Sequence, residues 1–175
     1  MADKHKAGLG LVSLFDSIDR RLAQFSVAVG ALLVLITVAL VTYSVIMRYL
    51  LNTPQTWTDE LVGYFLVAIV MLGVAESLRR GDHIGVDLLT DRLPGWGRKA
   101  MELWGMVAVI AVALAMVYSS YLMVAFSYQV ELYSDGYVEA PLWIPQSALL
   151  IGYGLLALSA ANRFLRLALG LPLPD

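Results

Sequence analysis

The residues best suited to chemistry lie in one short polar stretch, where Asp82, His83, Asp87 and Asp91 follow one another closely. Carboxylates that converge in this way could hold a metal ion for a phosphate-transfer reaction at a membrane surface. However, Asp87 and Asp91 fall on the polar side of an amphipathic pattern, where neighbouring arginines can offset their charge. His83 has no second His or Cys nearby. We therefore interpret these side chains as a solvated, charged face, and we expect neither a catalytic nor a metal site.

The same stretch predicts a short amphipathic helix along the membrane surface, over about residues 82–93. Pro94-Gly95 ends the pattern, and the residue types that follow are typical of a headgroup boundary. One side of the predicted helix is apolar and consists of Ile84, Leu88, Leu89 and Leu93.

The composition places the chain among integral membrane proteins. Of the 175 residues, 59% are hydrophobic and only 15% are charged, whereas soluble domains have roughly half and a quarter. Two histidines and no cysteine exclude thiolate-bound zinc, iron–sulfur clusters and disulfides. A net charge of −2 leaves no basic face for nucleic acid.

Four uncharged runs predict an all-α fold with four transmembrane helices in a single domain, residues 1–175. The expected spans are about 22–47, 57–78, 103–130 and 140–162, because a bilayer core of about 30 Å needs roughly 20 helical residues. The second run is too short unless its helix continues past Glu60 and Glu76. A re-entrant or surface helix is the alternative for this run.

The basic residues predict the orientation. Of the twelve Lys and Arg residues, eleven lie in the N-terminal segment, the middle connection and the tail, and Arg48 alone lies in the first outer connection. The positive-inside rule then puts both termini and the surface helix in the cytoplasm. We expect a multi-pass protein of the bacterial inner membrane, whose first run is retained because it is longer than a signal-peptide core and lacks a cleavage site.

The two outer connections carry polar and aromatic residues. Arg48 is costly at a membrane boundary unless it pairs with Asp59 or Glu60, or reaches water by snorkelling. Thr56 or Thr58 can cap the second helix. The second connection is acidic and aromatic, which suits either contact with a soluble partner or simple membrane anchoring.

The spans themselves contain almost no ionisable side chain and no interrupted half-helices, which ion-coupled carriers need. A stripe of small residues, Ala111, Ala115 and Ser119, suits close helix packing. The pattern indicates a chain that packs against other helices rather than one that reacts.

Several motifs in order resemble the small membrane (DctQ-like) subunit of tripartite ATP-independent periplasmic (TRAP) transporters, over about residues 15–168. The motifs are Arg48-Tyr49, Asn52, Trp57-Thr58-Asp59-Glu60-Leu61, Gly73-Val74-Ala75, Arg79-Arg80-Gly81-Asp82-His83-Ile84, Val86-Asp87, and the later Pro141-x-Trp143, Pro145 and Gly152.

The resemblance implies a non-catalytic subunit, with no cofactor, that braces a large elevator-type membrane subunit in the lipid bilayer. That large subunit would hold the sodium ions and the organic anion, such as a carboxylate or sialic acid, which a periplasmic binding protein delivers. No substrate-binding residue is expected here. The implied assembly residues are Arg48, Trp57, Asp59, Glu60, Arg79, Arg80, Asp82 and His83, and the implied docking residues are Asn52, Tyr133, Tyr137 and Trp143.

Two other classes of function remain as alternatives. One is a small lipid-headgroup enzyme that uses Asp82, Asp87 and Asp91, and the other is a homo-oligomeric channel or exporter. Metal-dependent lipid turnover would favour the enzyme, and a sodium-dependent uptake defect on deletion would favour the transporter subunit.

Overall fold

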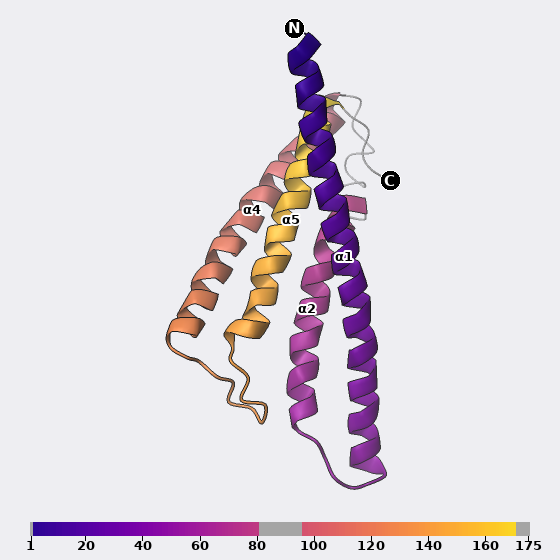
Figure 1. Cartoon of the computed structure of the whole chain (residues 1–175), viewed down its shortest axis with the longest axis vertical. Coiled ribbons are helices and arrows are strands. Elements are labelled where there is room, and N and C mark those ends of the chain that lie inside the picture. The colour runs from indigo at the N-terminus through magenta and orange to yellow at the C-terminus, as the bar shows by residue number, and fades with distance from the viewer. Residues whose placement is uncertain (1, 81–95, 171–175) are drawn as a thin grey trace.

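The computed structural model describes residues 2–80 and 96–170, with the backbone alone for residues 2–15 and 80. The described chain is helical, with α1 (Ala2–Tyr49), α2 (Trp57–Arg80), α4 (Trp96–Gln129) and α5 (Trp143–Leu169) (Figure 1). Each helix is long and apolar enough to cross a membrane, as the predicted all-α fold with four transmembrane helices requires. The predicted surface helix at 82–93 lies outside the described residues.

Three of the helices extend beyond the expected spans. α1 begins at Ala2 rather than near residue 22, α4 begins at Trp96 rather than near 103, and α5 covers 143–169 rather than 140–162. The reason is that charged residues mark the end of an apolar run without ending a helix. Glycine does end one: Gly170 follows α5 with a φ of 68°, and its N–H bonds to the carbonyls of Arg166 and Leu167.

The four helices form a row in the order α4, α5, α2, α1 (Figure 1). α5 packs against α4, α2 and α1, whereas α4 contacts neither α1 nor α2 within the described helices. We call the end where α1 begins and α5 finishes the termini end, and the end with residues 50–56 and 130–142 the loop end. The row is tight at the termini end, and the pair α4 and α5 diverges from α1 and α2 toward the loop end.

Buried residues seven positions apart, most of them small, line the helix contacts. In α4 the buried residues are Met106, Ala113, Ser120 and Ser127, and in α5 Gly152 and Ser159 have the same spacing. A seven-residue repeat keeps one face of a helix against its neighbour, and small side chains let two helices approach closely in lipid. The predicted stripe at 111, 115 and 119 instead lies exposed on the other side of α4.

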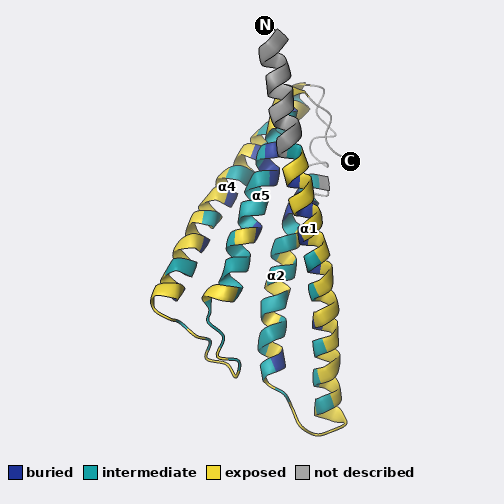
Figure 2. Ribbon diagram, viewed as in Figure 1, coloured by how far each residue is buried: buried dark blue, intermediate teal, exposed yellow. Residues whose placement is uncertain are grey.

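The outer faces of the row are apolar and exposed. Only 11–17% of the most apolar part of each span is buried inside the chain, and large side chains such as Phe25, Leu35 and Tyr118 are 65–69% exposed. Figure 2 shows this exposed surface along α1 and α4, the two edges of the row. These faces are therefore available to lipid or to another membrane protein.

The closest approach between α2 and α5 provides a test of this packing. A methyl group at Gly152 would lie 2.5 Å from Met71 Cβ and 2.8 Å from the Met71 carbonyl oxygen. Gly152→Ala is therefore expected to destabilise the protein by about 1–3 kcal/mol, measured by thermal unfolding in detergent. Gly154→Ala is the matched control in the same helix, because nothing lies within 4 Å of its added methyl. Equal melting temperatures for the two variants would contradict the close approach.

Candidate functional site

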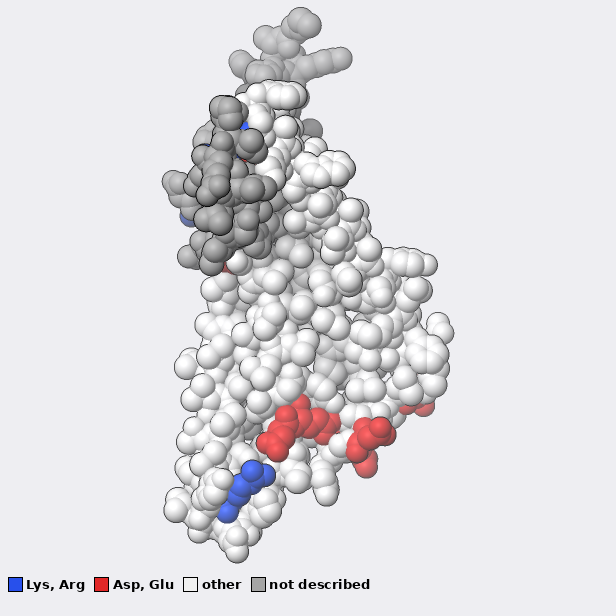
Figure 3. Space-filling model, turned by 180° about the vertical axis from the view of Figure 1, so that it is seen from behind, with Lys and Arg blue, Asp and Glu red and all other residues white. Residues whose placement is uncertain are grey.

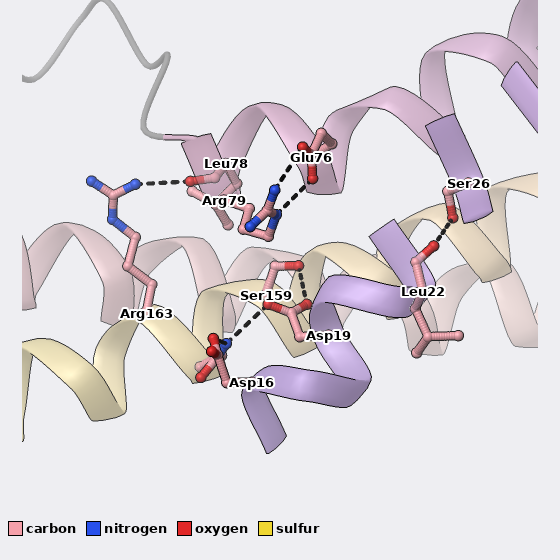
Figure 4. Close-up of polar contacts among 10 residues, drawn as sticks. Asp16, Asp19, Leu22, Ser26, Glu76, Leu78, Arg79, Ser159 and Arg163 are labelled. Carbon is pink, nitrogen blue, oxygen red and sulfur yellow. Dashed lines mark hydrogen bonds and ion pairs between the residues drawn. The ribbon is translucent and has the colours of Figure 1, made fainter. Parts of the chain in front are cut away.

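A cluster of buried charged and polar side chains joins α1, α2 and α5 at the termini end (Figure 4). The side chains come from the start of the apolar part of α1 and from the last turns of α2 and α5. We call this group the termini-end cluster, and its members are Asp16, Asp19, Glu76, Arg79, Ser159, Asn162, Arg163 and Arg166.

Asp19 lies at the centre of the contact between α1 and α5, where only 2% of its surface is exposed. Ser159 Oγ donates to Asp19 Oδ1 at 2.6 Å, and Asn162 Nδ2 donates to Asp19 Oδ2 at 3.0 Å. The same amide nitrogen lies 3.3 Å from Asp16 Oδ1. A carboxylate can only accept hydrogen bonds, so both carboxylates require the NH₂ side of the Asn162 amide. The cluster therefore sets one rotation and one height for α1 against α5.

Three arginines complete the termini-end cluster. Arg166 Nη2 lies 2.9 Å from Asp16 Oδ2, and Arg79 donates twice to Glu76, at 2.7 and 2.9 Å, with both side chains at most 10% exposed. Arg163 Nη1 donates at 2.8 Å to the carbonyl of Leu78, near the end of α2, where helical carbonyls lack helical partners.

The termini-end cluster has no net formal charge, because it contains three carboxylates and three guanidinium groups, among which Arg79 pairs with Glu76 and Arg166 pairs with Asp16. Buried charges in a membrane protein are costly unless they are paired in this way. Asp19 accepts hydrogen bonds from Ser159 and Asn162, and Arg163 donates to the Leu78 carbonyl. The described residues contain no group of three or more His, Cys, Asp or Glu that could hold a metal ion. The arrangement is suited to fixing helices, and it leaves no carboxylate pair directed at an open site.

A second polar contact lies at the loop end, between Glu60 in the first turn of α2 and the α4–α5 connection, residues 130–142. Its carboxylate accepts hydrogen bonds from Tyr64 Oη at 2.7 Å, from Ser134 Oγ, and from the Val138 N–H at 3.2 Å. A methyl group on Gly136 would overlap the same carboxylate. Glu60 therefore anchors residues 130–142 to α2.

The α4–α5 connection is itself ordered by backbone hydrogen bonds. Ser134 N donates to Ala140 O and Leu142 N donates to Leu132 O, both at 2.9 Å. These bonds align Tyr133 with Pro141 in an isolated antiparallel bridge. Glu131 and Glu139 have φ angles of 52° and 46°, the left-handed conformation that turns the chain at each side.

The loop ends of α1 and α2 pack against each other through predicted assembly residues and their neighbours. The Trp57 ring lies 6.2 Å from the Tyr43 ring of α1. Thr58 is fully buried and lies 3.1 Å from Ser44 Oγ. Its hydroxyl donates to Gln55 O at 2.8 Å. Of the two expected caps, Thr56 is the residue directly before α2, whereas Thr58 lies inside the helix.

The remaining predicted residues occupy separate places. Arg48 is exposed in the last turn of α1, and the described residues contain no ion pair between it and Asp59 or Glu60. Asp59 is exposed in the first turn of α2.

The predicted turn into the surface helix is described only as far as Arg79, which pairs with Glu76. The side chain of Arg80 is outside the described part of the chain, as are Asp82 and His83. The four predicted docking residues are exposed at the loop end: Asn52, Tyr133, Tyr137 and Trp143.

Sequence reasoning missed most of the termini-end cluster. Asp16 and Asp19 were not singled out at all, Glu76 served only as the boundary of the second apolar run, and Asn162 was counted as the end of the last run. One signal was available, because Ser159 and Arg166 continue the seven-residue spacing that starts at Gly152.

The chain matches the family described as "Tripartite ATP-independent periplasmic transporters, DctQ component" over residues 37–170. The chain belongs to this family. The DctQ match begins within α1 and ends at the residue that closes α5, so it contains α2, α4 and α5 completely. With four helices able to span a membrane, this DctQ component is a multi-pass membrane protein.

Individual relatives of this DctQ component have different solutes in their names. The ectoine TRAP transporter small permease protein TeaB of Halomonas elongata is 27% identical over 160 residues, 86% of this chain and 80% of TeaB. The sialic acid small permease protein SiaQ of Vibrio cholerae is 29% identical over 72 residues, 41% of this chain and 42% of SiaQ. The C4-dicarboxylate small permease protein DctQ of the same species is 34% identical over 62% of this chain and 41% of its own length. The match thus spans less than half of two of these relatives.

The first prediction from this site concerns Asp19. Asp19→Ala removes the acceptor for Ser159 and Asn162 in a buried position, which is expected to lower the free energy of unfolding by about 1–3 kcal/mol. The measurement is unfolding of the purified protein in mixed detergent and SDS. Asp59→Ala removes an exposed carboxylate and serves as the control. If the control loses as much stability as Asp19→Ala, the termini-end cluster does not hold the helices together.

The second prediction concerns Glu60. Glu60→Ala removes the acceptor shared by Tyr64, Ser134 and Val138, so amide hydrogens in residues 130–142 are expected to exchange about ten-fold faster, the equivalent of one lost hydrogen bond to a charged group. Hydrogen–deuterium exchange with mass spectrometry measures this directly. Exchange in α1 should not change, and Asp59→Ala should leave the loop unaffected. Unchanged loop exchange in Glu60→Ala would refute the anchoring role.

Proposed function

We propose that this chain is the small permease subunit of a sodium-driven TRAP transporter in the bacterial inner membrane, where it braces a large membrane permease that takes up an organic anion. The transporter is completed by a periplasmic binding protein that delivers the solute. The chain itself is not an enzyme in this proposal. The solute and sodium sites belong to the large permease.

The observation that carries this proposal is the closed termini-end cluster. A carrier for an anion or a sodium ion needs polar groups directed at an accessible site within the membrane. In the described spans, the carboxylates of Asp16, Asp19 and Glu76 are instead engaged with side chains of the same chain. The charges stabilise a rigid helical row, as a bracing subunit requires.

The partner is indicated by a fourth relative and by the exposed edges of the row. A 55-residue stretch of this chain is 31% identical to part of the sialic acid TRAP transporter permease protein SiaT of Haemophilus influenzae. That stretch is only 9% of SiaT, so a sequence like this one occurs inside a much longer permease chain. The exposed apolar face of α1 or α4 supplies the surface that such a permease would contact.

The orientation follows from the basic residues at the two ends. At the termini end lie Arg20, Arg21, Arg79, Arg98, Lys99, Arg163 and Arg166, whereas the described part of the loop end has Arg48 alone. The positive-inside rule puts the termini end in the cytoplasm and the loop end in the periplasm. The loop end, with its exposed aromatic residues, is then the side that meets the binding protein.

The solute is proposed only as a class. The small permease relatives are named for sialic acid, for ectoine and for C4-dicarboxylate, although they resemble the same chain. The identity of the solute is therefore set by the other components. A carboxylate or sialic-acid type of anion fits two of the three names.

The experiment that tests this proposal is a pull-down of the tagged chain from its native host in mild detergent. We expect a much larger polytopic membrane protein in equal amount, together with sodium-dependent uptake that is lost when the chain is deleted. Trp104→Ala, a change on the exposed face of α4, and Leu35→Ala, the corresponding change on α1, identify which edge binds the permease. Recovery of the chain alone, or only as its own oligomer, would overturn the proposal in favour of a channel, and metal-dependent lipid turnover would favour an enzyme.

A further inference from the structure

A hollow of about 380 Å³ lies at the loop end, where α4 finishes and α5 begins. Its walls come from the last residues of α4, from the first part of the α4–α5 connection and from the start of α5. We call it the aromatic pocket, and the lining residues that matter for its chemistry are Tyr128, Glu131, Tyr133, Pro141 and Trp143.

The walls of the aromatic pocket are held in place. Tyr128 and Trp143 meet edge to face, with ring centroids 5.8 Å apart and planes at 84°. Tyr133 is aligned with Pro141 by the antiparallel bridge, and the bond from Leu142 N to Leu132 O closes the base of the connection. The Glu60 anchor then holds this connection against α2. A site organised in this way loses little entropy when it binds a ligand.

The chemistry of the aromatic pocket suits a cation. Tyr128, Tyr133 and Trp143 are 66%, 57% and 37% exposed, so their rings are open to a ligand. Aromatic faces attract ammonium and guanidinium groups, and Glu131 adds a carboxylate to the same wall.

The surroundings of the pocket favour a ligand with a net positive charge. Asp135 and Glu139 lie exposed on the same connection, and Figure 3 shows acidic side chains at this end of the molecule. Among residues 48–60 and 130–142, the only basic residue is Arg48. This field attracts a lysine or arginine side chain. It repels the phosphate of a zwitterionic lipid headgroup, although such a headgroup also carries an ammonium group.

We propose that the aromatic pocket receives a lysine or arginine side chain of the soluble binding protein. This inference rests on the proposed function, since it assumes that the loop end faces the periplasm. It assigns a ligand chemistry to two of the predicted docking residues, Tyr133 and Trp143, and adds Tyr128 and Glu131 to them.

The test measures binding of the binding protein to the complex of this chain with its large permease, in nanodiscs of phosphatidylglycerol, whose headgroup has no ammonium group. Glu131→Gln and Tyr133→Ala are each expected to weaken binding about three- to five-fold, the usual worth of one exposed cation contact. Glu131→Gln is nearly isosteric, so it remains informative if Tyr133→Ala disturbs the connection.

Two matched controls separate the pocket from general effects. Asp135→Asn removes an equal charge outside the pocket wall, and should weaken binding less than two-fold because salt screens its field. Tyr118→Ala removes an exposed ring of α4 away from the pocket; in complexes that retain the large permease, this change should leave binding of the binding protein unchanged.

The outcomes distinguish this inference from the proposed function. If the wild-type complex forms and binds its partner, but the pocket variants bind as well as wild type, the inference fails and the proposed function stands. The inference also fails if the effect appears only when phosphatidylethanolamine is added, because the occupant is then a lipid. If the large permease is not recovered with the wild-type chain, the proposed function fails and the inference fails with it.

Discussion

The structure depends on the burial of one carboxylate. Asp19 is 2% exposed at the contact between α1 and α5, and an unpaired charge in that position would cost several kcal/mol. Ser159 and Asn162 remove this cost only if α5 is at the right height and rotation. The contact between the first and last helices thus determines how the termini end is assembled, and the neighbouring arginines balance the charge around it.

The loop end has a different construction. There the pair α4 and α5 stands apart from α1 and α2, and Glu60 spans the separation by accepting bonds from the α4–α5 connection. The row is closely packed at the termini end and is held by the Glu60 contacts at the loop end. The outer faces of α1 and α4, its two edges, make no contact with each other in the described part of the chain. Such a shape agrees with the bracing role proposed above.

The number of membrane spans could be predicted from the sequence, because a long uncharged run has few ways to cross a membrane other than as one helix. The ends of the helices were harder to predict, because the charges at Arg21 and Glu102 end the apolar runs while the helices continue. The termini-end cluster could not be predicted from local patterns, since Asp19 and Ser159 lie 140 residues apart. The residues of α4 that pack inside the chain are 106, 113, 120 and 127, and their spacing is visible in the sequence. An Ala-rich helix has several such sets of small residues, however, and the set that was predicted to pack was 111, 115 and 119. The anchoring of the connection by Glu60 likewise needs the folded positions of Ser134 and Val138.

The contact of Asp19 with α5 also has a consequence for synthesis of the protein. The ribosome makes α1 long before residues 159–166, and two other spans, α2 and α4, are inserted in between. The carboxylates of Asp16 and Asp19 therefore have no partners from α5 until that helix is made. During that time they must remain in water, at the headgroup level, or against another protein. These partners all come from α5, the last helix. A chain that stops before α5 would therefore carry uncovered acidic groups at its first span, a mark by which membrane quality control can separate unfinished copies from complete ones.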